Sequence, residues 1–504
     1  MMERQQPDQL DDELPLSSAA QLRAAGRTPT LPFAVELIEE DGASHRLRFE
    51  QLLRVLPGKR QVGIAHYRGQ RVLAKLFIAA HSARHWQRER DGIVALHAAG
   101  LPTPALVASA HLKGNSGVDG HALLSEFIAD AHSLAERWHA VANPAGNAAG
   151  LALLQPAFAL LGQLHAQGLI HEDLHLGNFL ARGEDADAAL LLIDGDAVRA
   201  LSPGQPLPTS AAMDNFALLA AQLPPLWDGW LKPLLASWQA AAPQLPQLDS
   251  DVLQQHIDRR RAVRIADYLA KSERNCSLFA TARHGKRHSI TVRRHAEQLA
   301  TILADPDAAL ASGQLLKDGN TCTVAGVDVA GLKLVIKRYN IKHAAHALSR
   351  AWRPSRAHHA WRAGHLLSLL GIATPPPLAV IEERHGPLRG RAWLITAWSD
   401  GEDLAHHLAP FVDQAPPPAT AQALIELFTA MQRHRISHGD FKASNLLWNE
   451  GNLILIDLDA TRQHRSTRSH LRAWQRDRAR LLRNWPQHSP LWQWLDQHLP
   501  KHDH

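Results

Sequence analysis

The chain carries the same series of sequence features twice, and this internal repeat limits its fold more than any other property. Each copy has an apolar strand pattern that ends in lysine, RVLAKLF with Lys75 and KLVIKRY with Lys337. A helical stretch, a Gly-x-x-Thr-Pro turn, an amphipathic helix, a His-x-Asp loop and an apolar strand ending in paired aspartates follow in the same order. Two similar domains in tandem are therefore predicted, which suits a length of 504 residues.

The two copies keep their register along the whole repeat. The corresponding residues are separated by nearly constant distances: Lys75 and Lys337 by 262 residues, Asp173 and Asp440 by 267, and Asp194 and Asp457 by 263. Each copy also opens with a β-rich pattern around a glycine turn and a short amphipathic piece, from Phe33 and from Leu278. We predict a disordered tail over residues 1–30, a first domain over 31–269 and a second over 270–504.

The string HEDLH at 171–175 fits the His-Glu-x-x-His pattern of zinc peptidases, but the repeat argues against that chemistry. The second copy, HGDFK at 438–442, has neither the glutamate nor the second histidine. Gly168 and Gly177 flank the first string, which favours a loop over the helix that a zinc pair needs. Both copies share His-x-Asp, an asparagine five residues after the aspartate, and a strand that ends in aspartate.

These shared residues are the types that phosphoryl transfer requires, because its catalysis is mostly positioning and charge neutralisation. In the first copy, Lys75 would hold the α- and β-phosphates of ATP, Asp194 and Asn178 would bind Mg²⁺, and Asp173 would accept the proton of the attacking hydroxyl. The same roles in the second copy fall to Lys337, Asp457, Asn445 and Asp440, with Lys442 available to the γ-phosphate.

The strings VLAKLF, HEDLHLGN and LLLIDGD together resemble the protein-kinase-like superfamily. The order of the motifs, with HGDFKASNLLW and LILIDLDA, is similar to the bacterial lipopolysaccharide core kinases, which phosphorylate heptose or Kdo of the inner core. The resemblance implies an α+β fold of two tandem kinase-like domains, each with a small antiparallel β-sheet lobe and a larger α-helical lobe. It also implies that Glu89 of the first copy pairs with Lys75.

The second copy departs from this pattern, because no acidic residue occurs between Lys337 and Glu382 and Ala360 stands at the position of Glu89. The activity of the second copy is therefore left open. Neither copy has a convincing glycine-rich phosphate loop, since LPGKRQVG at 56–63 and KDGNT at 317–321 match poorly. Asp196 and Asp459 suit a turn as well as a metal site, so neither is assigned a role.

Charge and composition bear on partners and location. Arginines and lysines interleave with tryptophans in two stretches, one with Lys342, Arg350, Trp352, Arg353, Arg356, Trp361 and Arg362, and one from Arg462 to Arg483 with eight arginines. These stretches suit an anionic sugar acceptor or anionic lipid headgroups, and no nucleic-acid partner is expected. A polar, acidic N-terminus, two cysteines and no uninterrupted apolar run of roughly 18 residues favour a cytoplasmic protein, peripheral at the inner membrane.

Two other functions remain open on the sequence alone. The chain can be a non-catalytic, pseudokinase scaffold in lipopolysaccharide core assembly, for which the missing helix glutamate of the second copy is the cue. It can also be a small-molecule kinase of the aminoglycoside or choline kinase type, because these enzymes share the loop pattern and the site fixes the donor more firmly than the acceptor.

Overall fold

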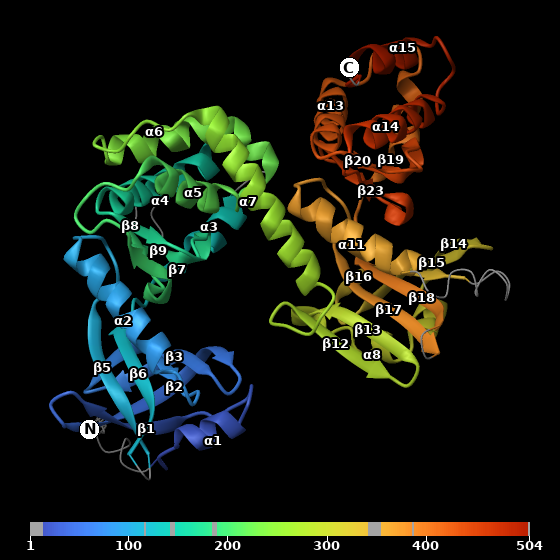
Figure 1. Cartoon of the computed structure of the whole chain (residues 1–504). Coiled ribbons are helices and arrows are strands. Elements are labelled where there is room, and N and C mark those ends of the chain that lie inside the picture. The colour runs from blue at the N-terminus through green and yellow to red at the C-terminus, as the bar shows by residue number, and fades with distance from the viewer. Residues whose placement is uncertain are drawn as a thin grey trace, which may run out of the picture. The chain divides into compact units, whose positions relative to one another are not determined.

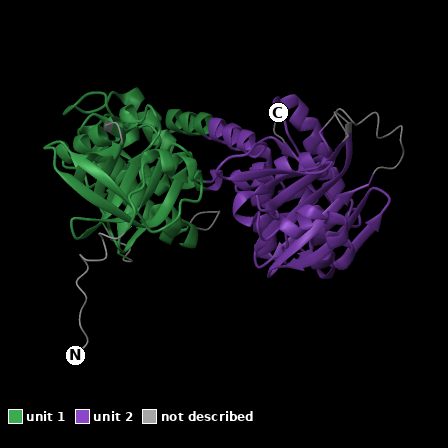
Figure 2. Cartoon of the chain, turned by 90° about the horizontal axis from the view of Figure 1, so that it is seen from below, with its two compact units in different colours: residues 1–223, 227–260 green, residues 224–226, 261–504 purple. Residues whose placement is uncertain are grey.

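The computed structural model of the chain describes residues 14–114, 117–141, 147–183, 189–340, 354–385 and 388–501. It consists of two compact units, unit 1 with residues 1–223 and 227–260 and unit 2 with residues 224–226 and 261–504 (Figure 2). The units divide within helix α7 (Ser250–Lys271), ahead of the joint that we placed at 269/270. Its early residues Leu253 and Ile257 belong to the core of unit 1, whereas Tyr268 packs on the core of unit 2.

The sheet lobe of unit 1 is a closed antiparallel barrel with the strand order β1-β2-β3-β4-β6-β5 (Figure 1, blue). Its strands and its one long helix are β1 (Phe33–Glu39), β2 (Ser44–Leu56), β3 (Arg60–Tyr67), β4 (Gln70–Phe77), α2 (Ala83–Ala98), β5 (Leu106–Gly114) and β6 (Gly117–Glu126). Alternate residues of these strands fill the barrel with a buried core that includes Phe49, Tyr67 and Leu76. The second half of β2 corresponds to the expected amphipathic piece of the first copy, which is therefore strand.

Part of the predicted disordered tail is ordered. Helix α1 (Ala19–Ala24) begins at Ser18, whose side chain accepts a hydrogen bond from the backbone N–H of Gln21 in a capping box. Ala19 and Leu22 are buried with the core of the barrel. Arg23 of this helix also donates to the carbonyl of Ile78 and pairs with Asp119. The expectation of disorder is thus wrong from residue 14 to residue 30, because apolar and polar contacts hold this segment against the barrel; residues 1–13 lie outside the described residues.

The helical lobe of unit 1 packs around α4, whose buried face carries Leu154, Phe158 and Leu161. Its elements are β7 (Ala131–Ser133), α3 (Leu134–Val141), α4 (Ala148–Ala166), β8 (Leu169–His171), β9 (Phe179–Arg182), β10 (Leu190–Leu192), β11 (Val198–Ala200), α5 (Thr209–Ala220), η3 (Pro225–Trp230), which spans the two units, and α6 (Leu231–Ala241), together with the 3-10 turns η1 (Leu176–Asn178) and η2 (Gly195–Ala197). The turn η1 leads into β9 and η2 follows β10, and because β9 pairs with β10 the predicted catalytic loop and metal loop lie side by side.

The sheet lobe of unit 2 is an open seven-stranded sheet with the order β12-β13-β17-β18-β16-β15-β14. Its elements are β12 (Phe279–His284), β13 (Arg287–Val292), η4 (Arg293–His295), α8 (Ala300–Ala304), α9 (Pro306–Ser312), β14 (Gln314–Gly319), β15 (Cys322–Val329), β16 (Leu332–Tyr339), α11 (Arg356–Leu369), β17 (Pro377–His385) and β18 (Leu388–Ala397). Here α8 and α9 replace the second half of the long strand of unit 1, as expected for an amphipathic piece in this copy.

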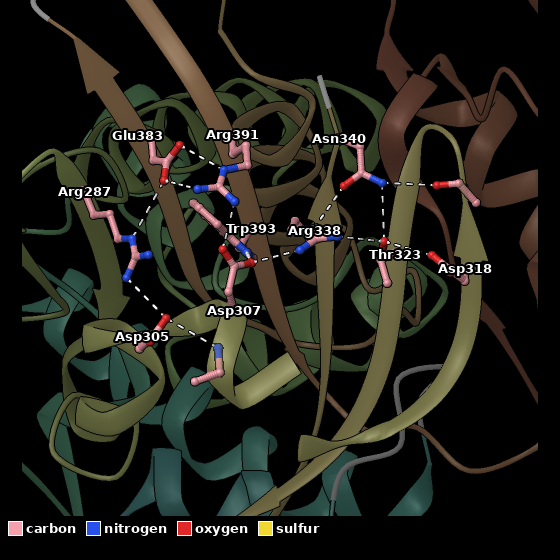
Figure 3. Close-up of polar contacts among 12 residues, drawn as sticks. Arg287, Asp305, Asp307, Asp318, Thr323, Arg338, Asn340, Glu383, Arg391 and Trp393 are labelled. Carbon is pink, nitrogen blue, oxygen red and sulfur yellow. Dashed lines mark hydrogen bonds and ion pairs between the residues drawn. The ribbon is translucent and has the colours of Figure 1, made fainter. Parts of the chain in front are cut away.

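Polar contacts hold α9 against the sheet of unit 2 (Figure 3). Asp307 accepts hydrogen bonds from Arg338 at 3.2 Å, Arg391 at 3.0 Å and the indole N–H of Trp393 at 3.1 Å. Apolar side chains of α8 and α9, among them Ile302 and Leu310, complete the cover over this face. The two sheet lobes therefore bury their apolar faces differently. The sheet of unit 1 closes into a barrel around its core, whereas the open sheet of unit 2 is covered by α8 and α9.

The helical lobe of unit 2 repeats the element order of unit 1. Its elements are β19 (Glu402–Asp403), α12 (Leu404–Leu408), η5 (Ala409–Phe411), α13 (Pro418–Arg433), β20 (Ile436–Ser437), η6 (Ala443–Asn445), β21 (Leu446–Asn449), β22 (Asn452–Leu455), η7 (Leu458–Ala460), β23 (Arg462–Gln463), α14 (Thr467–Leu482) and α15 (Pro490–His498). The apolar positions predicted for the helix before the His-x-Asp loop, Leu424, Leu427, Phe428 and Met431, are all buried in α13. The predicted fold, two tandem kinase-like domains with a sheet lobe and a helical lobe each, is thereby confirmed.

Helix α4 is long and apolar enough to cross a membrane by length and composition, with a mean hydropathy of 1.2. Half of it is buried inside unit 1, where Gly162 approaches the backbone of Trp238 in α6. Packing within the helical lobe thus accounts for its apolar character.

Candidate active site

The two predicted loops are bonded to each other in the same way in both units. In unit 1 the imidazole Nε2 of His171 donates to the carbonyl of Ile193 at 3.2 Å, and the N–H of Ile193 donates to the carbonyl of Asn178 at 2.9 Å. Burial lowers the pKa of His171, so the ring is neutral at physiological pH and keeps this donor role. In unit 2, His438 bonds the carbonyl of Ile456 at 2.9 Å. HEDLH thus runs from a strand end into a turn.

The aspartate at the end of each apolar strand adopts a left-handed backbone conformation, with φ 72° at Asp194 and φ 59° at Asp457. This conformation is costly for a residue with a side chain, and its recurrence indicates a functional constraint. Burial disfavours ionisation of Asp194, but the charges of Lys75 and Arg60 outweigh it and hold its pKa below the ordinary value. The pKa of Asp457 is lowered in the same way, with Lys337 as the principal cation.

The strand lysine of unit 1 lies between two carboxylates. The Lys75 ammonium donates to Glu89 of α2 in a short contact and lies 3.5 Å from Asp194. Glu89 is fully buried, and Arg60 from the start of β3 approaches its other oxygen at 3.6 Å. Close packing of α2 on η2 makes this pairing possible, because a Cβ atom at Gly92 would lie only 2.0 Å from the carbonyl oxygen of Gly195.

These groups line one cavity of unit 1, with a volume of about 370 Å³. Of the residues singled out from the sequence, Lys75, Glu89, Asn178 and Asp194 line it, together with apolar side chains such as Val62 and Leu123. Within the described residues, the buried Oδ1 of Asn178 has no hydrogen-bond partner. An unpaired buried oxygen beside an ionised carboxylate is a pair of ligands that Mg²⁺ prefers, so the residues present fit the metal.

Asp173 does not line this cavity; it is exposed on the loop beside it. Its charge acts on the ring of His171 together with that of Asp194, which places both carboxylates near the same imidazole. Among the residues that the structure describes, no hydrogen bond or ion pair involves the Asp173 carboxylate. The predicted proton acceptor of unit 1 is therefore open to solvent.

Unit 2 has a corresponding cavity of about 510 Å³, lined by Lys337, Lys442, Asn445 and Asp457. Ala360 of α11 lines it as well, at the position that Glu89 occupies in unit 1. The ammonium of Lys337 instead donates to Asp457 at 2.6 Å and to Asp459 at 2.9 Å. Asp459, which the sequence left unassigned, thus supplies a second carboxylate to the lysine.

The predicted proton acceptor of unit 2 is held by an arginine. The Nε and Nη2 of Arg480 in α14 donate to one carboxylate oxygen of Asp440, at 2.8 and 2.7 Å. Lys442 lies 3.8 Å from the other oxygen, and the amide of Asn445 donates to it at 3.5 Å. Asp440 is thus surrounded by donors, whereas Asp173 in unit 1 is not.

Sequence reasoning missed the residues that hold the His-x-Asp loops in place. In unit 1 the side chain of Asn215 in α5 accepts from the N–H of His171 at 3.2 Å and donates to its carbonyl at 2.9 Å. In unit 2, Asp477 of α14 accepts from the N–H groups of His438 at 2.6 Å and Gly439 at 2.9 Å. These side chains differ in type and lie 44 and 39 residues after their histidines, so the repeat gave no signal for them.

The two hairpins that matched a glycine-rich loop poorly do lie over the cavities. Residues of β2 and β3, among them Leu53 and Arg60, line the cavity of unit 1, and Leu316 and Lys317 of β14 line that of unit 2. Each hairpin brings a cation to the site, and both cations act on the metal-loop aspartate. The basic residues in LPGKR and LLKDG were the signal that could have identified these positions.

The basic stretches are not the mixed basic and aromatic surfaces that we expected. Trp361 and Trp474 are buried core residues, and Arg356 and Arg362 are paired with Asp459 and Glu273. The predicted members Lys342, Arg350, Trp352 and Arg353 lie outside the described residues. Four arginines at four-residue spacing remain exposed along α14: Arg468, Arg472, Arg476 and Arg480.

Comparison with known proteins identifies a family for both units. The model of the lipopolysaccharide kinase (Kdo/WaaP) family matches residues 57–204 and 311–498, one segment in each unit and together more than half of the chain. No curated protein matches the sequence. A solved structure described as "WaaP in complex with acyl carrier protein" aligns with a TM-score of 0.32 and 19% identity, covering 42% of this chain and 88% of that one.

Proposed function

Since the chain belongs to the lipopolysaccharide kinase (Kdo/WaaP) family, we propose that unit 1 transfers the γ-phosphoryl group of ATP to a heptose or Kdo hydroxyl of the lipopolysaccharide inner core. The observation that carries this proposal is the cavity of unit 1, around which Lys75, Glu89, Asn178 and Asp194 gather. A cation, its buried counter-ion and two oxygen ligands at one cavity are the groups that phosphoryl transfer needs.

Each side chain has a distinct role in this proposal. Lys75, oriented by the buried Glu89, contacts the α- and β-phosphates, while Asn178 and the ionised Asp194 hold the magnesium ion. When bound, Mg²⁺ neutralises charge on the phosphates. The Asp173 carboxylate orients the acceptor hydroxyl and accepts its proton, and its exposure leaves room for a bulky sugar. Asn215 keeps the loop of Asp173 in position.

The acceptor and the location of the enzyme belong to the same proposal. We infer an anionic acceptor, phosphorylated at the inner face of the inner membrane, where the exposed arginines of α14 contact anionic headgroups or sugars. Since Arg480 is paired with Asp440, Arg468, Arg472 and Arg476 present three cations on one stretch of helix. Their contacts with anionic groups are expected to weaken as the salt concentration rises.

Mass spectrometry of core oligosaccharide from cells with the wild-type or the Asp173→Ala protein tests this function. The variant is expected to lower the phosphate content of the core, while Asp91→Ala, which removes an exposed carboxylate of α2 outside the cavity, leaves it unchanged. An Asp173→Ala core with the wild-type phosphate content refutes the assignment.

For unit 2, binding of nucleotide without transfer is a second candidate function. The pair between Arg480 and Asp440 favours it, because two guanidinium N–H groups occupy the carboxylate oxygen that an acceptor hydroxyl would otherwise contact. Transfer by unit 2 would first require Arg480 to leave Asp440.

A further inference from the structure

We infer that Asp459 is the residue that positions Lys337 for nucleotide binding in unit 2, in place of the helix glutamate that this unit lacks. The inference deepens the proposed function, because it rests on Lys337 being a phosphate ligand. It follows from a comparison of equivalent positions in the two units, which share the element order but differ at the lysine.

The contacts of Asp459 are those of a fixed counter-ion. Its side chain is only 9% exposed, and one oxygen accepts from Lys337 at 2.9 Å and from Arg356 at 2.6 Å. The hydroxyl of Tyr339 donates to the other oxygen at 2.6 Å, and the Arg356 guanidinium lies over the Tyr339 ring at 5.2 Å. Donors on both oxygens hold the carboxylate in one orientation, as required of a residue that orients the lysine ammonium group.

The equivalent aspartate of unit 1 makes no such contact. Asp196 lies two residues after Asp194, as Asp459 lies two after Asp457, but it pairs with Arg88 at 3.1 Å and His85 at 3.6 Å on the outer side of α2. Glu89 takes the lysine there. The aspartate at this position therefore pairs with the helix alone in unit 1, and with both the helix and the strand lysine in unit 2.

The packing of the helix against the metal loop differs between the units, as does the position that supplies the counter-ion of the strand lysine. The contact of α2 with the metal loop depends on Gly92 and Gly195, and a Cβ atom at Gly195 would lie 2.4 Å from the carbonyl of Glu89. In unit 2 the corresponding residues are Ala363 and Leu458, both with side chains. The glycine–glycine contact of unit 1 therefore has no counterpart in unit 2, where the metal loop itself supplies a counter-ion to Lys337.

The role assigned to Asp459 has a consequence for metal binding by Asp457. Because Asp457 and Asp459 stand on one turn, Lys337 can release Asp457 to a bound metal ion and remain oriented by Asp459. Arg356, the first residue of α11, shares Asp459 with Lys337, so the start of this helix helps to hold the counter-ion in place.

Calorimetric titration of the full chain with Mg-ATP tests the inference. Lys75→Ala is introduced first, so that the remaining binding reports unit 2. Asp459→Asn in that background is expected to lower the affinity at least tenfold, and Ala360→Glu added to it is expected to recover most of the loss by restoring a helix carboxylate. The matched control is Asp196→Asn in a Lys337→Ala chain, which is expected to leave the affinity of unit 1 unchanged.

The outcomes separate this inference from the proposed function. An unchanged affinity in Asp459→Asn, or a Lys75→Ala chain that binds no Mg-ATP, overturns the role of Asp459 while leaving transfer by unit 1 untouched. A loss that Ala360→Glu does not recover, accompanied by a lowered melting temperature, shows a structural role instead and also overturns it. Failure of the proposed function appears elsewhere, as unaltered core phosphorylation in Asp173→Ala cells.

Discussion

Replacement of Gly92 by alanine is expected to disable unit 1 without unfolding it. A Cβ atom at this position would meet the carbonyl oxygen of Gly195 at 2.0 Å, whereas real contacts stay above 3.0 Å. Helix α2 and the metal loop must therefore separate by about 1 Å, which draws Glu89 away from Lys75. We expect a stability loss of about 1–3 kcal/mol from overpacking, and a loss in kcat/KM on the order of 100-fold from misplacing the phosphate ligands.

The assay is steady-state phosphoryl transfer from ATP, with thermal unfolding measured on the same preparations. Gly229→Ala is the matched control, because a Cβ atom there meets no atom within 4 Å. Ala363→Gly at the equivalent position of unit 2 is expected to leave transfer by unit 1 unchanged. A Gly92→Ala protein that is folded and has the kinetic constants of the wild type would refute the link between this helix contact and the lysine pair.

Three further predictions concern the metal, the second unit and pH. Asn178→Ala is expected to raise the Mg²⁺ concentration needed for half-maximal activity at least tenfold. The melting temperature should change little, since the buried oxygen of Asn178 has no partner among the described residues. An unchanged Mg²⁺ requirement would count against Asn178 as a metal ligand. In an Asp173→Asn chain, Arg480→Leu is expected to increase ATP hydrolysis, because it frees Asp440, and a rate equal to that of Asp173→Asn alone would show that the pair does not restrain unit 2. Burial lowers the pKa of His165 from 6.5 to about 4. Between these pH values the histidine is protonated in the unfolded chain but not in the folded one. The free energy of unfolding therefore falls as the pH drops from 6.5 towards 4, by up to about 3 kcal/mol. The melting temperature of His165→Asn should depend less on pH in that range than that of the wild type, and equal slopes would exclude His165 as the cause.

The parts of the site that could be predicted are local and repeated. Lys75, Asn178 and Asp194 stand at strand ends and loop positions that short motifs specify, and duplication separated these motifs from chance. The same comparison rejected the zinc pattern in HEDLH. Glu89 was found through the resemblance to the kinase pattern alone, in which a helix glutamate pairs with the strand lysine.

The parts that could not be predicted depend on tertiary packing. Asp459 pairs with Lys337 whereas the equivalent Asp196 pairs with Arg88, and this difference between matching aspartates is visible only when the structures of the two units are compared. Arg480 belongs to a run of arginines in which no spacing distinguishes the one that reaches Asp440. The closed barrel of unit 1 and the open sheet of unit 2 likewise differ through long-range strand pairing, β1 with β5 in unit 1, which alternating patterns do not encode.

Transfer of radiolabelled γ-phosphate from ATP to purified lipopolysaccharide core by the wild-type protein and by Asp173→Asn tests the central claim most directly. We predict incorporation by the wild type, a loss of at least 1000-fold in the variant, and nearly equal Mg-ATP affinities for the two proteins, because Asp173 lies outside the cavity that holds the nucleotide. Equal incorporation by both proteins, or none by the wild type with any core acceptor, would contradict the account.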